Sequence, residues 1–213
     1  MSQFFRLHPE NPQPRLVKQA VQIIRDGGVI ALPTDSSYAL ACQLDNKEAV
    51  ERLRRIRGLD DRQLLSLLVR DLSELASFAM VDNQQYRLIK SVTPGPYVFV
   101  LQATKEVPRR LSHPSRKTIG LRVPGHPIPL AILEELGEPL IASTLILPPD
   151  TEPLNDADEI RDRLEKHLDL VIDGGTAACP REPSTVIDLT GGEPVLVRAG
   201  RGSLEPFGLE APA

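Results

Sequence analysis

The sequence has few of the residues that mark disulfide-rich, metal-binding or base-stacking proteins. Its 213 residues include two cysteines, no tryptophan, five phenylalanines and three tyrosines. Cys42 and Cys179 lie far apart and form no C-x-x-C pair, so we expect two small buried side chains rather than a disulfide or a thiolate metal site. The scarcity of aromatic rings also argues against a protein that binds nucleic acid mainly by base stacking.

Long hydrophobic runs are missing as well. No stretch of about 18 consecutive apolar residues occurs. The N-terminal segment lacks both the basic region and the long apolar region of an export signal. We therefore expect no membrane span and a cytoplasmic location.

The common nucleotide, hydrolase and metal motifs are absent too. The chain has no G-x-x-x-x-G-K-[ST] and no G-x-G-x-x-G, which excludes the P-loop and the Rossmann fingerprint. It has no G-x-S-x-G elbow, so a hydrolase nucleophile is not predicted. The four histidines are scattered and form no H-x-x-x-H or H-E-x-x-H face, so we expect no protein-bound transition metal.

Charge is present but unevenly distributed. The whole chain has 25 basic and 29 acidic residues, a formal net charge of −4. The segment from Arg52 to Arg122 holds 14 basic and 6 acidic residues, so its local charge is +8 and the rest carries −12. Of the basic residues 19 are arginine, whose planar fork binds phosphate and carboxylate bidentately. The middle of the chain is therefore predicted to bind anions, although any single arginine could simply lie on a solvated face.

Hydrophobic periodicity predicts alternating helices and strands. Helices are expected over residues 16–26, 46–56, 71–78, 83–92, 127–136 and 155–167. Strands are expected over residues 29–32, 38–42, 64–69, 97–101, 118–123, 139–145, 170–172, 185–189 and 194–198. This order predicts an α/β fold, with one domain over residues 1–206 built on a mixed sheet and a loose C-terminal tail over residues 207–213.

Small hydroxyls and arginines recur where the predicted strands begin or end. Thr34 follows the first buried strand, and Ser184 opens a later one. Thr118 and Arg122 lie four apart on one strand and so share a face, while Arg198 closes the last strand. Ligands of open α/β sheets collect outside strand ends, so these side chains could converge on one site. A Ser or Thr at a strand end is also a common turn residue that satisfies its own backbone.

Six segments, taken in order, resemble the YrdC/YciO family, and its YciO branch most of all. They run from Gly28 to Leu40, Pro94 to Pro96, Gly120 to Pro124, Gly174 to Gly175, Pro183 to Asp188 and Val197 to Gly200. The resemblance spans about residues 16–202 and implies a single twisted α/β domain, the YrdC-like fold, with a basic concave face.

The resemblance also implies an activity. Family enzymes of the threonylcarbamoyl-AMP synthase type combine L-threonine, bicarbonate and ATP into threonylcarbamoyl-adenylate and pyrophosphate, for the t6A modification of tRNA. This implies a nucleotidyltransferase with ATP as a substrate and Mg²⁺ carried by the nucleotide. Members are also described as binding double-stranded RNA, so an accessory protein that binds tRNA or double-stranded RNA without robust synthase activity is the alternative. A small-anion site of another chemistry on the same scaffold is a third possibility.

Roles are implied at matching positions. L-threonine would be bound by Thr34, Arg122, Thr144 and Ser184, and ATP by Arg57, Thr118 and Arg198. Arg55 and Arg57 are the expected catalytic residues. Attack on the α-phosphorus with pyrophosphate leaving requires charge neutralisation and alignment, to which arginines and Mg²⁺ are suited.

Some positions depart from the synthase pattern. The Lys-x-Arg pair of the synthases is Arg55-Ile56-Arg57 here, and their Ser-x-Asn pair is Thr144-Leu145-Ile146. Ile146 lacks the asparagine amide, a loss of about 1–3 kcal/mol against a buried partner and of roughly ten- to a hundredfold in rate. Ala39 stands for a usual glycine and Leu68 for a histidine. These departures predict a weak synthase.

Overall fold

The computed structural model describes residues 1–60, 62–63, 65–175 and 179–211 of the chain. Within these ranges eleven strands form one mixed sheet, in the order β1-β9-β2-β3-β8-β4-β7-β6-β10-β11, with β5 paired to β6. The helices are α1 (Pro14–Arg25), α2 (Lys47–Arg57), α3 (Leu72–Phe78), α4 (Asn83–Val92), α5 (Pro127–Leu136) and α6 (Ala157–Leu164), and a short 3-10 helix covers Glu205–Phe207. The strands are β1 (Gln3–Arg6), β2 (Ile30–Leu32), β3 (Ala39–Gln43), β4 (Ser66–Leu68), β5 (Ala79–Met80), β6 (Tyr97–Ala103), β7 (Thr118–Arg122), β8 (Leu140–Thr144), β9 (Leu170–Asp173), β10 (Thr185–Asp188) and β11 (Val195–Arg198).

Strand direction changes along the sheet. β1, β9 and β2 are parallel, and so are β4 with β7 and β6 with β10. The pairs β2–β3, β3–β8, β8–β4, β7–β6 and β10–β11 are antiparallel. The predicted single α/β domain with a mixed sheet is therefore confirmed.

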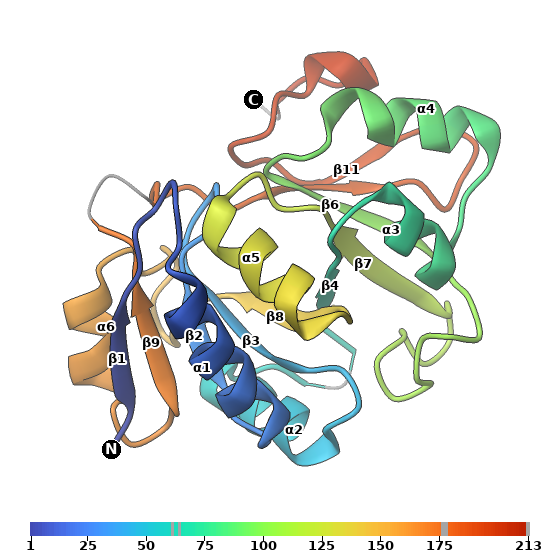
Figure 1. Ribbon diagram of the computed structural model, residues 1–213. Coiled ribbons are helices and arrows are strands. Elements are labelled where there is room, and N and C mark those ends of the chain that lie inside the picture. Colours follow the sequence, from blue (N-terminus) through green and yellow to red (C-terminus); the bar gives the residue numbers. More distant parts are fainter. Residues whose placement is uncertain (61, 64, 176–178, 212–213) are drawn as a thin grey trace.

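Alternation along the central strands divides the interior into two cores. Ile30 and Leu32 of β2 face the core under α1 and α5, whereas Ala31 faces the core under α2 and α6. Figure 1 shows α1 and α5 side by side on one face of the β2, β3 and β8 part of the sheet. Since each fully buried Leu or Ile is worth about 1.5–3 kcal/mol, the two faces together hold the sheet in register.

Side-chain caps set several helix starts. The Asn46 side chain accepts a hydrogen bond from Ala49 N at 2.9 Å, and Asp71 does the same for Glu74 N at 2.8 Å. Asp82 and Gln85 form a reciprocal capping box at α4. At its other end α2 stops at Gly58, whose φ of +64° is left-handed. This stop places Arg57 on the last turn of α2.

The C-terminal segment is packed, so the expectation of a loose tail is wrong for its first residues. Phe207 is 7% exposed, and its ring centroid lies 5.6 Å from that of Tyr97 and 6.1 Å from that of Phe99. Leu209 packs against the same core. Residues 212–213 lie outside the described ranges.

The short strands β1 and β5 were not predicted from the sequence. In the described part of the chain, no helix is long and apolar enough to cross a membrane. Both cysteines are buried and free, as expected.

Candidate active site

A cavity of about 430 Å³ opens on the sheet face that also carries α1 and α5. Ala39, Leu68 and Ala142 belong both to the core beneath these helices and to the cavity wall, which places the cavity beside that core. Its polar wall consists of Arg57, Gln63, Ser66, Arg122, Ser143, Thr144, Ser184 and Arg198. We call it the arginine cavity.

Arg57 enters the arginine cavity from the last turn of α2. Its Nε donates a hydrogen bond to Ser143 Oγ of β8 at 3.1 Å. Burial, and then the positive charge of Arg198, lower the pKa of Arg57 to about 10. The side chain is therefore fixed by β8 and carries a charge that no anion of the described chain offsets.

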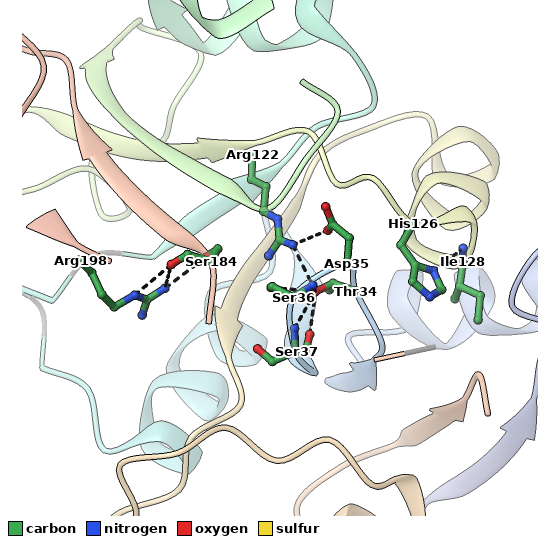
Figure 2. A network of polar contacts seen from close by, with 9 residues as sticks. All are labelled: Thr34, Asp35, Ser36, Ser37, Arg122, His126, Ile128, Ser184 and Arg198. Carbon is green, nitrogen blue, oxygen red and sulfur yellow. Dashed lines mark hydrogen bonds and ion pairs between the residues drawn. The ribbon is translucent and has the colours of Figure 1, made fainter. Parts of the chain in front are cut away.

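Arg198 reaches the cavity from the edge strand β11. Its Nε and Nη2 donate to the carbonyl oxygen of Ser184 at 3.1 and 2.8 Å, and Nη2 also donates to Ser184 Oγ at 3.1 Å. Figure 2 shows these contacts as a fork closed on Ser184. Burial, followed by the charge of Arg122, lowers the pKa of Arg198.

Arg122 lies at the end of β7 and makes an ion pair with Asp35. The two side chains are only 6% and 15% exposed. The same nitrogen, Nη2, donates to Thr34 Oγ1 at 3.2 Å (Figure 2). Arg122 Nε and Asp35 Oδ2 are buried and have no hydrogen-bond partner among the described residues. Asp35 therefore holds Arg122 in place while leaving polar capacity on both side chains unused.

The hydroxyl of Thr34 is occupied by its own turn. It donates to Ser37 O at 2.6 Å and accepts from Ser36 N and Ser37 N at 3.1 and 3.3 Å. Thr34 is completely buried and does not line the arginine cavity. Thr34, which was predicted to bind L-threonine, therefore lies behind Arg122, and its hydroxyl stabilises the turn of residues 34–37.

The thiol and phenol groups near this turn stay protonated. Burial raises the pKa of Cys179 to about 11 and raises the pKa of Tyr38 still further. The Tyr38 hydroxyl donates to Ile172 O at 2.8 Å, which ties the residue before β3 to β9. Neither group is a nucleophile at neutral pH.

The structure brings together most of the predicted site residues. Arg57, Arg122, Thr144, Ser184 and Arg198 line the arginine cavity. They come from α2, β7, β8, the residue before β10, and β11, which are far apart in the sequence. The expected basic concave face is therefore present.

Two other predicted residues lie elsewhere. Arg55, expected to be catalytic, is exposed and lines a different hollow beside α2. Thr118, expected to bind ATP, is buried at the start of β7 and is not part of the cavity wall. Residues two apart on a helix are rotated by about 200° around its axis, so the side chains of Arg55 and Arg57 leave α2 on nearly opposite sides. This helical rotation could have been read from the sequence.

Of the residues that depart from the synthase pattern, some line the arginine cavity and one does not. Leu68 and Ala39 line the arginine cavity, so their side chains face any ligand there. Ile146 is half-buried, lies outside the cavity wall and donates its N–H to Thr144 O at 2.9 Å. Asp35 and Ser143 also lie at strand ends, but the sequence implied no role for either, because the contacts of Asp35 with Arg122 and of Ser143 with Arg57 depend on the tertiary structure.

The chemical capacity of the arginine cavity is anion binding. Three guanidinium groups, of which Asp35 neutralises one, surround about 430 Å³. Mutual repulsion between partly buried arginines is relieved when an anion enters. Among the described residues no group of three or more His, Cys, Asp or Glu side chains is arranged to hold a metal ion.

Comparison with known proteins gives the evolutionary context. The sequence model of the Sua5/YciO/YrdC family, described as "Telomere recombination", matches residues 22–200. The Escherichia coli protein YciO is 55% identical over 97% of this chain and 100% of its own length. Its crystal structure has the same coverage and a TM-score of 0.94 to this chain.

More distant relatives have assigned functions. A threonylcarbamoyl-AMP synthase of Halorhodospira halophila is 31% identical over 84% of this chain and 93% of its own length. The structure of P. abyssi Sua5 complexed with L-threonine is 26% identical, with a TM-score of 0.84 over 92% of this chain and 57% of that chain. The matched segment and the shared fold lead to one conclusion: the chain belongs to the Sua5/YciO/YrdC family.

Proposed function

We propose that this protein is a nucleotidyltransferase of the threonylcarbamoyl-AMP synthase type. It would convert ATP, L-threonine and bicarbonate into threonylcarbamoyl-adenylate and pyrophosphate for the t6A modification of tRNA. The observation that carries the proposal is the convergence of Arg57, Arg122 and Arg198 on one cavity. Two relatives support the choice of substrates, since one is named threonylcarbamoyl-AMP synthase and another is complexed with L-threonine.

The arrangement of the arginines suits two ligands of different charge. Arg57 and Arg198 are close enough that the charge of Arg198 lowers the pKa of Arg57, so a polyphosphate between them would relieve that repulsion. Arg122 lies beside the 34–37 turn and suits a single carboxylate, because Asp35 already offsets part of its charge. The cavity volume of about 430 Å³ is typical of small-ligand sites.

In the proposed reaction the protein mainly positions the reactants. Bicarbonate first carboxylates the free amine of threonine, and water leaves as the N–C bond forms. An oxygen of the resulting carbamate then attacks the α-phosphorus, a P–O bond forms, and the bond to pyrophosphate breaks. Arg57, Arg198 and the Mg²⁺ of the nucleotide would stabilise the charge on the departing pyrophosphate. The carbamate is already an anion, so no side-chain base is needed.

We expect turnover to be slow. Leu68 faces the arginine cavity at the position where the synthases carry a histidine, and its side chain offers no hydrogen bond to a ligand. A missing hydrogen bond to a charged group costs about 1.5–3 kcal/mol. The rate would fall by roughly ten- to a hundredfold relative to a synthase that keeps this contact.

Pyrophosphate release tests the proposal directly. Purified protein should release pyrophosphate from MgATP only when L-threonine and bicarbonate are both present, with the adenylate detected by mass spectrometry. Arg198→Ala should lower the rate by about a hundredfold or more, because it removes a donor to the developing charge.

Arg15→Ala is the matched control. Arg15 is an exposed arginine on α1 that does not line the arginine cavity, so the rate should not change. Equal rates for the two variants, or pyrophosphate release without threonine, would contradict the proposal. Restoration of t6A in cells that lack their own synthase extends the test to the whole pathway.

A second candidate function is binding of tRNA or double-stranded RNA without synthesis. It is favoured by a further basic hollow, lined by Lys47, Arg109 and Arg110 among others, outside the arginine cavity. Binding through phosphates requires affinity to fall steeply as salt rises. Salt-dependent RNA binding by a protein that forms no adenylate would favour this candidate, whereas adenylate formation without RNA binding would exclude it.

A further inference from the structure

A second hollow, of about 510 Å³, lies between α2 and the turn that connects α6 to β9. We call it the α2–α6 hollow. It shares no lining residue with the arginine cavity. One wall is formed by Arg52, Arg55 and Ile56 of α2, and the other by residues 164 and 166–169.

An anchored ion pair forms one end of the α2–α6 hollow. Arg52 pairs with Asp169, and their side chains are 35% and 42% exposed. Asp169 Oδ2 also accepts a hydrogen bond from Val29 N at 2.8 Å, and Asp169 N donates to Val29 O at 2.9 Å. These two contacts fix Asp169 to Val29, the residue before β2, so Arg52 is held by a rigid partner.

The remaining charges of the α2–α6 hollow are basic. Arg55 lies three residues after Arg52 and therefore on the same face of α2. Lys166 and His167 lie opposite, and all three side chains are exposed. Asp169 is the only acid among the described lining residues, and Arg52 neutralises it. Arg55 and Lys166 thus leave the hollow with an excess of positive charge.

The floor of the same hollow is apolar. Leu164 and Leu168 are buried and Ile56 is half-buried, yet all three contribute to the lining. The volume of about 510 Å³ is far larger than one tetrahedral anion needs and matches a small organic ligand. A cationic rim over an apolar floor selects a molecule with both an anionic group and an apolar body.

We propose that the α2–α6 hollow binds a small organic phosphate. The phosphate group lies between Arg55 and Lys166, and the apolar body rests on Ile56, Leu164 and Leu168. Arginine binds phosphate oxygens through its fork and lysine as a point charge, so the two sides of the hollow contribute complementary contacts. This site is independent of the proposed synthase activity, because it uses none of the same residues.

Site-resolved NMR with phenyl phosphate tests the proposal. Titration of the full-length protein should shift the amide signals of residues 52–56 and 164–169. The Arg55→Gln and Lys166→Gln double variant should weaken binding by roughly tenfold or more, since it removes two charged hydrogen-bond donors. Both positions are exposed, so the variant should fold, and unchanged amide shifts elsewhere verify this. Arg15→Gln is the matched control and should bind like the parent protein.

Three results of these titrations would overturn the proposal. Shifts confined to the arginine cavity would locate the phosphate site there instead. Inorganic phosphate that binds as tightly as phenyl phosphate would remove the role of the apolar floor. Binding of an RNA duplex but not of phenyl phosphate would assign the hollow to a polynucleotide surface. Since pyrophosphate release depends on Arg198 and not on Arg55, failure here leaves the synthase assay unaffected, and the reverse holds as well.

Discussion

Arg55 and Arg57 are two residues apart on α2 and lie in very different surroundings. Arg57 is half-buried and bonded to Ser143, and burial, followed by the charge of Arg198, lowers its pKa to about 10. Arg55 is exposed and lines the α2–α6 hollow. The same contrast separates the buried Arg122–Asp35 pair from the partly exposed Arg52–Asp169 pair. Charges that are buried interact strongly and can define a specific anion site, whereas exposed charges are screened by solvent and attract anions only weakly. Burial therefore matters more here than the number of arginines.

The largest expected effect concerns the buried pair. Asp35→Ala leaves Arg122 as an uncompensated buried charge, which should lower the free energy of unfolding by about 3–5 kcal/mol. Urea denaturation followed by circular dichroism measures the loss. Asp35→Asn keeps an oxygen acceptor and should lose less. An unchanged unfolding midpoint in Asp35→Ala would mean that Asp35 does not hold Arg122.

Removal of the two neighbouring arginines tests the difference between the two sides of α2. Arg57→Ala should lower kcat/KM for pyrophosphate release by about a hundredfold or more, because a fixed donor in the cavity is lost. Arg55→Ala should change it by less than about threefold, as expected for an exposed charge outside the cavity. Steady-state kinetics of both variants compares them directly. Equal losses would restore the catalytic role that the sequence assigned to Arg55.

The pH dependence of anion binding should follow the lowered pKa of Arg57. Arg57 is protonated below about pH 10 and neutral above it, so affinity is full at lower pH and falls as pH rises through about 10. The loss of one charge-assisted contact is worth roughly tenfold. Sulfate is a suitable probe for NMR titration because it remains a dianion throughout. Arg57→Ala should bind weakly at all pH values, and an equally steep fall in this variant would assign the transition to another group.

The smallest expected effect concerns the partly exposed Arg52–Asp169 pair. Asp169→Asn removes the charge that faces Arg52 but keeps an oxygen that can accept from Val29 N. The pair is more than a third exposed, so the free energy of unfolding should fall by less than about 1 kcal/mol, and the difference should shrink in high salt. Urea titrations at low and high salt measure both quantities. A loss as large as that of Asp35→Ala would contradict the comparison.

Local sequence signals predicted most of the fold. Asp71 and Asp82 mark helix starts through side-chain caps, and Gly137 marks the end of α5 with a φ of +76°. The strands β1 and β5 were not predicted, because each is short and forms only by pairing with another strand. β1 pairs with β9, more than 160 residues later, and its Phe4 and Phe5 are only half-buried. Similarly, Phe207 is ordered by contact with Tyr97 and Phe99 rather than by any local pattern.

The candidate site was only partly predictable. The family motifs indicated Arg57, Arg122, Ser184 and Arg198, and the structure brings all of them to one cavity. The occupation of Thr34 by its own turn could not be told from its position alone. The threonine after a buried strand fits both a ligand contact and a turn, and only the measured hydrogen bonds decide between them.

The sequence by itself determined the class of the protein, because apolar periodicity, caps and ordered motifs are local and survive without tertiary detail. It also determined that the Arg52 to Arg122 segment carries an excess of positive charge. Only the tertiary structure decided which of these basic residues line a common cavity. Arg198, from outside the segment, completes the arginine cavity, while Arg55, from inside it, faces another hollow. Sheet order and helix phase set which side chains meet, and burial then sets the strength of their interactions.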